Sequence, residues 1–118
     1  MSGTKERRQF VRLNVLTDVS YAKRLPSEVA KLSLSKNIGA GGICLIVYEE
    51  MRESEILDLK IYLPEGLSPV SAVGKIVWVK EFVVGDDLKG KRYDVGIEFI
   101  KIDKEDLKKI QKYVFSHA

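Results

Sequence analysis

Hydrophobic and polar residues alternate with a period of two along most of this chain, up to about residue 101. This period is typical of β-strands that bury one face, because successive side chains point to opposite sides of a strand. In the first such segment one face carries Val15, Thr17, Val19 and Tyr21. The pattern predicts six strands, over residues 15–21, 30–35, 43–48, 57–63, 70–83 and 91–101.

Two details of this pattern predict which side chains are buried. In the second segment Ala30, Leu32 and Leu34 alternate with lysine and serine, so we expect these three residues to face the core. Trp78 and Phe99 fall inside alternating strands, and the pattern therefore predicts that both are core residues.

The connections predict how the strands pair. Residues 64–69 and 85–90 are short, polar and rich in turn formers, and neither is long enough for a parallel crossover. Only the end of the chain changes period, where Asp103 is placed as an N-cap and apolar residues recur at helical spacing as Leu107, Ile110 and Val114. The predicted fold is all-β, a six-stranded antiparallel β-barrel with a C-terminal α-helix.

Composition limits the classes of protein that fit. A chain of 118 residues with 45% hydrophobic content suits one domain, and a second would not fit. The single cysteine, Cys44, excludes an internal disulfide and is expected to be buried and inert. The first residues are polar and unlike a signal peptide, and no run approaches the roughly 20 apolar residues of a membrane span. We therefore expect a reduced, cytoplasmic protein that does not associate with a membrane.

The net charge of +3 is small, but its distribution is uneven. Residues 1–24 hold six of the 20 basic groups and two of the 17 acidic groups, which gives +4. The rest of the chain holds 14 basic and 15 acidic groups, which gives −1. An anionic ligand would therefore be attracted to the N-terminal end.

Two short motifs carry the candidate chemistry. Arg8 and Arg12 are four residues apart, a spacing that places both side chains on one face of either a helix or a strand. The guanidinium group of arginine can donate two parallel hydrogen bonds to phosphate oxygens. It can also recognise the edge of guanine or stack on a base. The glycine-rich segment Asn37 to Gly42 would allow a ligand to approach the main chain closely. Together the motifs indicate a site for a nucleotide with two negative charges.

These residues resemble the PilZ domain, a bacterial family of cyclic di-GMP receptors in second-messenger signalling, whose pattern is R-x-x-x-R followed by [D/N]-x-S-x-x-G. The first half is complete from Arg8 to Arg12. The second half matches at Asn37 and Gly42, but Gly39 stands where the family usually has serine. The late segment 93–99 looks like the last strand of the family.

The resemblance implies a binding mechanism without catalysis. Arg8 and Arg12 would clamp cyclic di-GMP, and Arg7 would add a phosphate contact. Asn37 and the main chain from Gly39 to Gly42 would form the platform. Residues 1–13 would be a flexible basic arm and residues 14–118 the barrel domain, so that the ligand orders the arm across the barrel.

The resemblance also implies what the altered surface does. It would be recognised by a downstream protein of the motility, biofilm or polysaccharide machinery. Because the motif begins at residue 8, we expect no domain upstream of it.

Three other functions compete with this hypothesis. The Gly39 departure supports a PilZ-fold adaptor that has lost the nucleotide and works through protein contacts alone. A barrel that binds single-stranded nucleic acid is less favoured, because exposed basic and aromatic residues are not interleaved in the sequence. An enzyme is not expected, since the one histidine, His117, is next to last and no nucleophile–base pair or metal set is present.

Asp86 and Asp87 are interpreted as turn residues. We expect no metal and no cofactor beyond the ligand.

Overall fold

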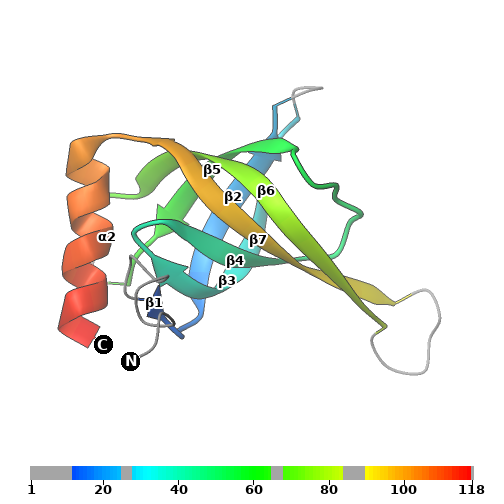
Figure 1. Ribbon diagram of the computed structural model, residues 1–118, viewed down its shortest axis with the longest axis horizontal. Helices are drawn as coiled ribbons and strands as arrows, with labels where there is room; N and C mark the ends of the chain where they lie inside the picture. The colour runs from blue at the N-terminus through cyan, green and yellow to red at the C-terminus, as the bar shows by residue number, and fades with distance from the viewer. Residues whose placement is uncertain (1–11, 25–27, 65–67, 84–89, 118) are drawn as a thin grey trace, which may run out of the picture.

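The computed structural model describes residues 12–24, 28–64, 68–83 and 90–117 of the chain (Figure 1). These residues form seven strands followed by one helix. In chain order the elements are β1 (Arg12–Leu13), β2 (Thr17–Lys23), β3 (Lys31–Gly39), β4 (Gly42–Val47), β5 (Ile56–Tyr62), β6 (Val70–Val83), β7 (Lys91–Ile102) and α2 (Lys104–His117).

The strands β2 to β7 close into a barrel. They neighbour one another in the order β3-β2-β5-β6-β7-β4, and β4 pairs again with β3, so that the sheet has no open edge between them. Every pairing is antiparallel. The predicted fold, a six-stranded antiparallel barrel with a C-terminal helix, is therefore confirmed. The two-residue strand β1 is added to the end of β3, where Arg12 pairs with Gly39.

The barrel is filled by aliphatic side chains from every long strand. The fully buried residues include Val19, Ile38, Leu45, Leu57, Ile61, Ile76 and Val95. The helix α2 lies beside the barrel and contacts β6, β3 and β1 (Figure 1). It adds Ile110, Tyr113 and Val114 to the core. Its amphipathic face is thus the one that helical spacing predicted.

The predicted orientation of β3 is wrong. Leu32 is 81% exposed and Leu34 is 38% exposed, whereas Ser35 is completely buried. The register of β3 against β4 shifts between Ser35 and Asn37, which is the signature of a β-bulge. Because one extra residue reverses the alternation, the apolar residues before the bulge face outward. The hydroxyl of the buried Ser35 has a hydrogen-bond partner nearby, since it donates to the carbonyl of Asn37 at 2.6 Å.

The long strands β6 and β7 form a hairpin that extends beyond the barrel on the side opposite α2 (Figure 1). The remaining predicted strands agree with the structure to within two residues at each end. In the described part of the chain, no helix has the length and apolar character needed to cross a membrane.

Candidate functional site

A cavity of about 420 Å³ lies on the outer surface of the barrel, over β3, β4, β7 and β6. Its wall includes Arg12, Asn37 and Gly42, which are three of the six residues that the sequence motifs predicted as ligand contacts. Trp78 on β6 and Glu98 on β7 form the opposite side. The cavity therefore brings Arg12, the last residue of the first motif, next to Asn37 and Gly42 of the second.

The strand register explains why residues so far apart in sequence meet here. One row across the sheet runs through Asn37, Cys44, Gly96 and Trp78. The next row runs through Arg12, Gly39, Gly42 and Glu98. Side chains directly opposite each other across antiparallel strands point to the same face of the sheet. Both rows therefore face outward, into the cavity.

Two β-bulges aim the side chains that define this site. The bulge between Ser35 and Asn37 turns Asn37 to the outer face, next to Cys44. A second bulge lies between Ile76 and Trp78, where Ile76 pairs with the buried Ile97 and Trp78 pairs with Gly96. Bulges are common beside functional sites because they redirect a side chain without ending the strand.

The prediction that Trp78 belongs to the core is wrong. Strict alternation from Ile76 would have buried it, but the bulge leaves Trp78 on the outer face, 44% exposed and lining the cavity. Phe99, by contrast, packs against the core as predicted.

Arg12 is positioned by a hydrogen bond to the other half of the motif. Its Nη2 atom donates to Oδ1 of Asn37 at 2.7 Å. The bond joins a cation to a neutral amide and orients the guanidinium. Arg12 also pairs with Gly39 through β1. Arg12 of the predicted clamp is therefore in direct contact with Asn37 of the predicted platform.

Two glycines of the cavity wall, Gly42 and Gly96, stand where a side chain would clash with neighbouring atoms. A Cβ atom at Gly42 would lie 2.0 Å from the carbonyl oxygen of Ile97, so the strands could not approach as they do. A Cβ at Gly96 would lie 2.1 Å from Nε1 of Trp78. The indole therefore rests directly on the main chain of β7, and only glycine leaves room for it.

A cluster of charges borders the cavity one row further along the sheet. The carboxylate of Asp94 is 3% exposed and accepts hydrogen bonds from Lys36 at 2.8 Å and Arg92 at 3.1 Å. Burial alone would raise the pKa of Asp94, but these hydrogen bonds outweigh it and lower the pKa below its usual value. Asp94 is therefore charged at neutral pH and holds two cations beside the site.

Cys44 is buried in the cavity floor, as the sequence predicted. Burial raises the pKa of its thiol, and the neighbouring Asp94 raises it further. The thiol is therefore protonated at neutral pH and is a poor nucleophile. In the described part of the chain, no group of three or more His, Cys, Asp or Glu residues is placed to hold a metal.

The predicted site residues thus fall into three groups. Arg12, Asn37 and Gly42 line the cavity, and Gly39 is buried beside it, paired with both Arg12 and Gly42. Arg7 and Arg8 lie outside the described residues, as does most of the predicted arm, residues 1–13. The acidic pair at residues 86–87 is outside them as well.

Sequence analysis missed three contributors, namely Trp78, Gly96 and Glu98. The last two belong to the segment 93–99 that was assigned only as a strand. Gly96 and Glu98 are two residues apart on one strand, so the period of two places both on the same face of the sheet. This pattern could have indicated that the two residues belong to one outer surface.

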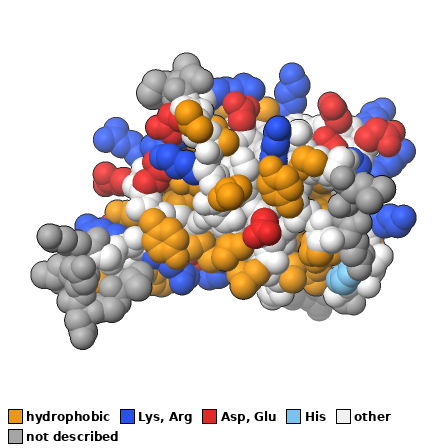
Figure 2. Space-filling view, turned by 180° about the vertical axis from the view of Figure 1, so that it is seen from behind, with side chains coloured by type: hydrophobic (Ala, Val, Ile, Leu, Met, Phe, Trp, Pro, Cys, Tyr) orange, Lys and Arg blue, Asp and Glu red, His pale blue; other side chains and the backbone are white. Residues whose placement is uncertain are grey.

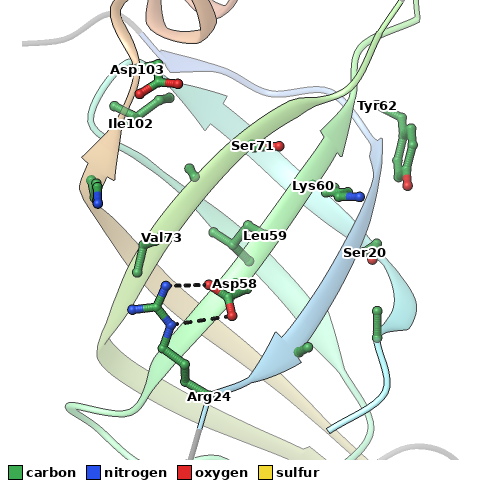
Figure 3. A pocket seen from close by; sticks show the side chains of 14 residues that line it. Ser20, Arg24, Asp58, Leu59, Lys60, Tyr62, Ser71, Val73, Ile102 and Asp103 are labelled. Atoms are coloured by element: carbon green, nitrogen blue, oxygen red, sulfur yellow. Dashed lines mark hydrogen bonds and ion pairs between the residues drawn. The ribbon is translucent and has the colours of Figure 1, made fainter. Parts of the chain in front are cut away.

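A second cavity, also of about 420 Å³, lies over β2, β5 and β6 (Figure 3). Arg24 reaches across it to Asp58, with Nη2 3.0 Å from Oδ1. Lys60 and Tyr62 lie further along β5 from this pair (Figure 3). None of the predicted ligand residues lines this cavity.

Comparisons with solved structures show the same fold in other proteins. The B. subtilis inhibitor of motility MotI/DgrA aligns with a TM-score of 0.73 and 24% identity, over 93% of this chain and 50% of that one. The c-di-GMP-bound PilZ domain of E. coli YcgR gives a TM-score of 0.69 and 13% identity, over 94% and 91%. The K. pneumonia MrkH–c-di-GMP complex gives 0.72 and 17%, over 93% and 51%. The chain thus spans about half the length of MotI/DgrA and MrkH.

No curated protein matches the chain. A family comparison does match, and it covers residues 6–116 with the description PilZ domain. PilZ domains are non-enzymatic receptors of c-di-GMP. With the barrel, the cavity and the motif residues in place, the chain belongs to the PilZ domain family.

Proposed function

We propose that this protein is a cyclic di-GMP receptor that binds its ligand in the cavity between Arg12 and Trp78. The observation that carries the proposal is the contact of Arg12 with Asn37 on the outer face of the barrel. Arg12 comes from β1 and Asn37 from β3, and both side chains line the cavity.

The residues around the cavity match the parts of the ligand. Arg8 and Arg12 would pair with the two phosphodiester groups, and Arg7 would add a further phosphate contact. Asn37 and the main chain of Gly39 to Gly42 would form the platform. Trp78 presents an aromatic surface of the kind on which a guanine can stack. No residue in this arrangement needs to donate or remove a proton.

The N-terminal arm would transmit the signal. β1 attaches residue 12 to the end of β3, beside the cavity. If the arm, residues 1–13, which β1 anchors to β3 at its end, closes over the ligand, the outer surface of this side of the barrel changes, which is a disorder-to-order switch. A downstream protein, by family analogy one of the motility, biofilm or polysaccharide machinery, would then recognise the altered surface. We further propose that the protein is cytoplasmic.

The adaptor hypothesis rests on Gly39, which removes one hydroxyl from the motif. A single lost hydrogen bond typically costs about 0.5–1.5 kcal/mol, which lowers affinity without abolishing it. A nucleic-acid surface is not favoured on the face shown in Figure 2. Lys and Arg there are mixed with Asp and Glu along the upper margin, and hydrophobic side chains with an acidic one among them occupy the middle.

Titration calorimetry with cyclic di-GMP tests the proposal, with single-stranded oligonucleotides as the comparison ligand. We expect saturable binding of one cyclic dinucleotide species that is weakened by Arg8→Ala and Arg12→Ala. The adaptor hypothesis instead predicts no heat at high micromolar nucleotide. Gly39→Ser should tighten binding by about 0.5–1.5 kcal/mol. An unchanged affinity in that variant would refute our account of residue 39.

A further inference from the structure

One charged side chain in the cavity has the wrong sign for a phosphate site. Glu98 lies on β7 on the outer face and lines the cavity that also contains Arg12. Within the described residues its carboxylate has no hydrogen-bond or ion-pair partner, although Lys75 stands directly opposite it on β6. A carboxylate here repels a dianionic ligand unless it accepts hydrogen bonds from it.

The other strong acceptors around the cavity are already in use. Oδ1 of Asn37 accepts from Arg12, which leaves the amide NH₂ of Asn37 as a donor. The carbonyl of Gly41 accepts from the N–H of Phe99 at 3.0 Å. The indole N–H of Trp78 can only donate. Glu98 is therefore the side chain, among the described residues of this wall, whose oxygen acceptors accept no hydrogen bond within the protein.

The geometry places this acceptor beside the stacking surface. Gly96 and Glu98 both face outward on β7, two residues apart, which corresponds to about 7 Å along the strand. Trp78 rests on Gly96. A planar base stacked on the indole can thus direct one of its edges toward Glu98. The main chain of Arg12, on β1, is three strand spacings from β7, or about 14 Å along the sheet, and its guanidinium reaches Asn37 on β3, two strands from β7. The two charges therefore address different parts of the ligand.

Guanine is the base whose edge suits a carboxylate. Its Watson–Crick edge carries two adjacent donors, N1–H and N2–H₂, which match the two oxygens of one carboxylate. Adenine offers a donor at N6 but an acceptor at N1, and the lone pair of N1 would face a negative oxygen. Hypoxanthine keeps N1–H but lacks the N2 amine. The three bases therefore form a graded series against an acceptor-only group.

We propose that Glu98 is a specificity-determining residue, which accepts N1–H and N2–H₂ of one guanine of the ligand. This inference rests on the proposed cyclic di-GMP site and adds the group that distinguishes guanine from other bases. Glu98 is exposed on the outer face, so replacing it should leave the barrel intact.

The test compares cyclic di-GMP, cyclic di-IMP and cyclic di-AMP in calorimetric titrations of the wild-type chain and Glu98→Gln. For the wild type we expect about tenfold weaker binding of cyclic di-IMP and at least 30-fold weaker binding of cyclic di-AMP. In Glu98→Gln the affinity for cyclic di-GMP should fall about 30-fold, while the affinity for cyclic di-AMP should stay the same or rise. The preference would then largely disappear.

Lys75→Gln is the matched control, because it changes the neighbouring charge on β6 outside the cavity wall. It should keep the preference of the wild type among the three ligands. Thermal melts of all variants check that the fold is retained. If the wild type binds cyclic di-GMP and Glu98→Gln keeps the same ligand ratios, this inference is wrong and the proposed function stands. If the wild type binds none of the three ligands, both fail.

Discussion

The barrel carries two cavities of about the same volume, 420 Å³ each, on different parts of its outer surface. In one, Arg12 is held by the neutral amide of Asn37. In the other, Arg24 is held by the carboxylate of Asp58, and both side chains are about half exposed. The first hydrogen bond orients the guanidinium through a neutral acceptor. The second places opposite charges together, which weakens their attraction for an anion.

The residues that form the floors of the two cavities also differ. Gly42 and Gly96 form the first floor, where a ligand or an indole can lie against the main chain. The second floor carries Ala22 on β2 and Val73 on β6, whose side chains point outward from the sheet. Volume therefore does not distinguish the two cavities as candidate sites. Chemistry does, because only the first combines a bare main chain, an oriented arginine and an exposed tryptophan.

The largest expected effect comes from filling the glycine floor. Gly42→Ala would place a Cβ atom 2.0 Å from the carbonyl oxygen of Ile97, a main-chain atom that cannot rotate away. We expect a loss of about 3 kcal/mol in the free energy of unfolding, measured by urea denaturation. In the second cavity, Ala22→Gly should cost no more than about 1 kcal/mol. Equal losses would show that the glycine floor has no special role.

Arg12→Ala should weaken cyclic di-GMP binding by about 2 kcal/mol, or roughly 30-fold, because charge-assisted hydrogen bonds are lost. Arg24→Ala is the matched control in the second cavity and should leave the affinity unchanged. Calorimetry on the two variants measures this difference. A larger loss of affinity for Arg24→Ala would indicate that the ligand binds in the second cavity.

Trp78→Ala should weaken binding by about 1.4 kcal/mol, close to tenfold, through the loss of base stacking. Gly96→Ala should give a similar loss, since the added methyl group displaces the indole that rests there. Tyr62→Ala removes an aromatic side chain from the second cavity and serves as the control. If Tyr62→Ala weakened binding and Trp78→Ala did not, the ligand site would be the second cavity and not the first.

The smallest effect concerns the charges at the border of the first cavity. Asp94→Asn should cost about 1 kcal/mol of stability at pH 7, since hydrogen bonds from Lys36 and Arg92 to a carboxylate are weakened. The exposed pair of the second cavity is worth less, so Asp58→Asn should cost about 0.5 kcal/mol or below.

The pH dependence of this difference has a defined sign. Burial raises the pKa of Asp94, but the hydrogen bonds from Lys36 and Arg92 lower it by more, so the folded state holds its proton less tightly than the unfolded state. The contribution of Asp94 is therefore complete above the ordinary aspartate pKa of about 3.9 and is lost as the pH falls through the lowered value. Urea titrations of wild type and Asp94→Asn should converge in that range. A gap that widens on acidification would contradict the assignment.

The sequence predicted the fold well because period-two alternation and short polar turns leave few alternatives to an antiparallel barrel. The motif also predicted Arg12, Asn37 and Gly42 as ligand contacts; the three line one cavity, and their contact with a ligand stays a prediction. Trp78 was misassigned because a bulge shifts the alternation by one residue, and nothing in Ile76-Val77-Trp78-Val79 shows where the extra residue lies. The orientation of Leu32 and Leu34 was wrong for the same reason.

The central claim is that the ligand occupies the cavity between Arg12 and Trp78. Trp78 is the single tryptophan of the chain, so its indole N–H gives one unambiguous signal in a ¹H–¹⁵N correlation spectrum. On titration with cyclic di-GMP we expect this signal, the Asn37 side-chain amide and the Gly42 amide to shift together, while Ala22 and Lys60 amides do not move. Shifts confined to Ala22, Asp58 and Lys60, with a stationary indole signal, would contradict the account.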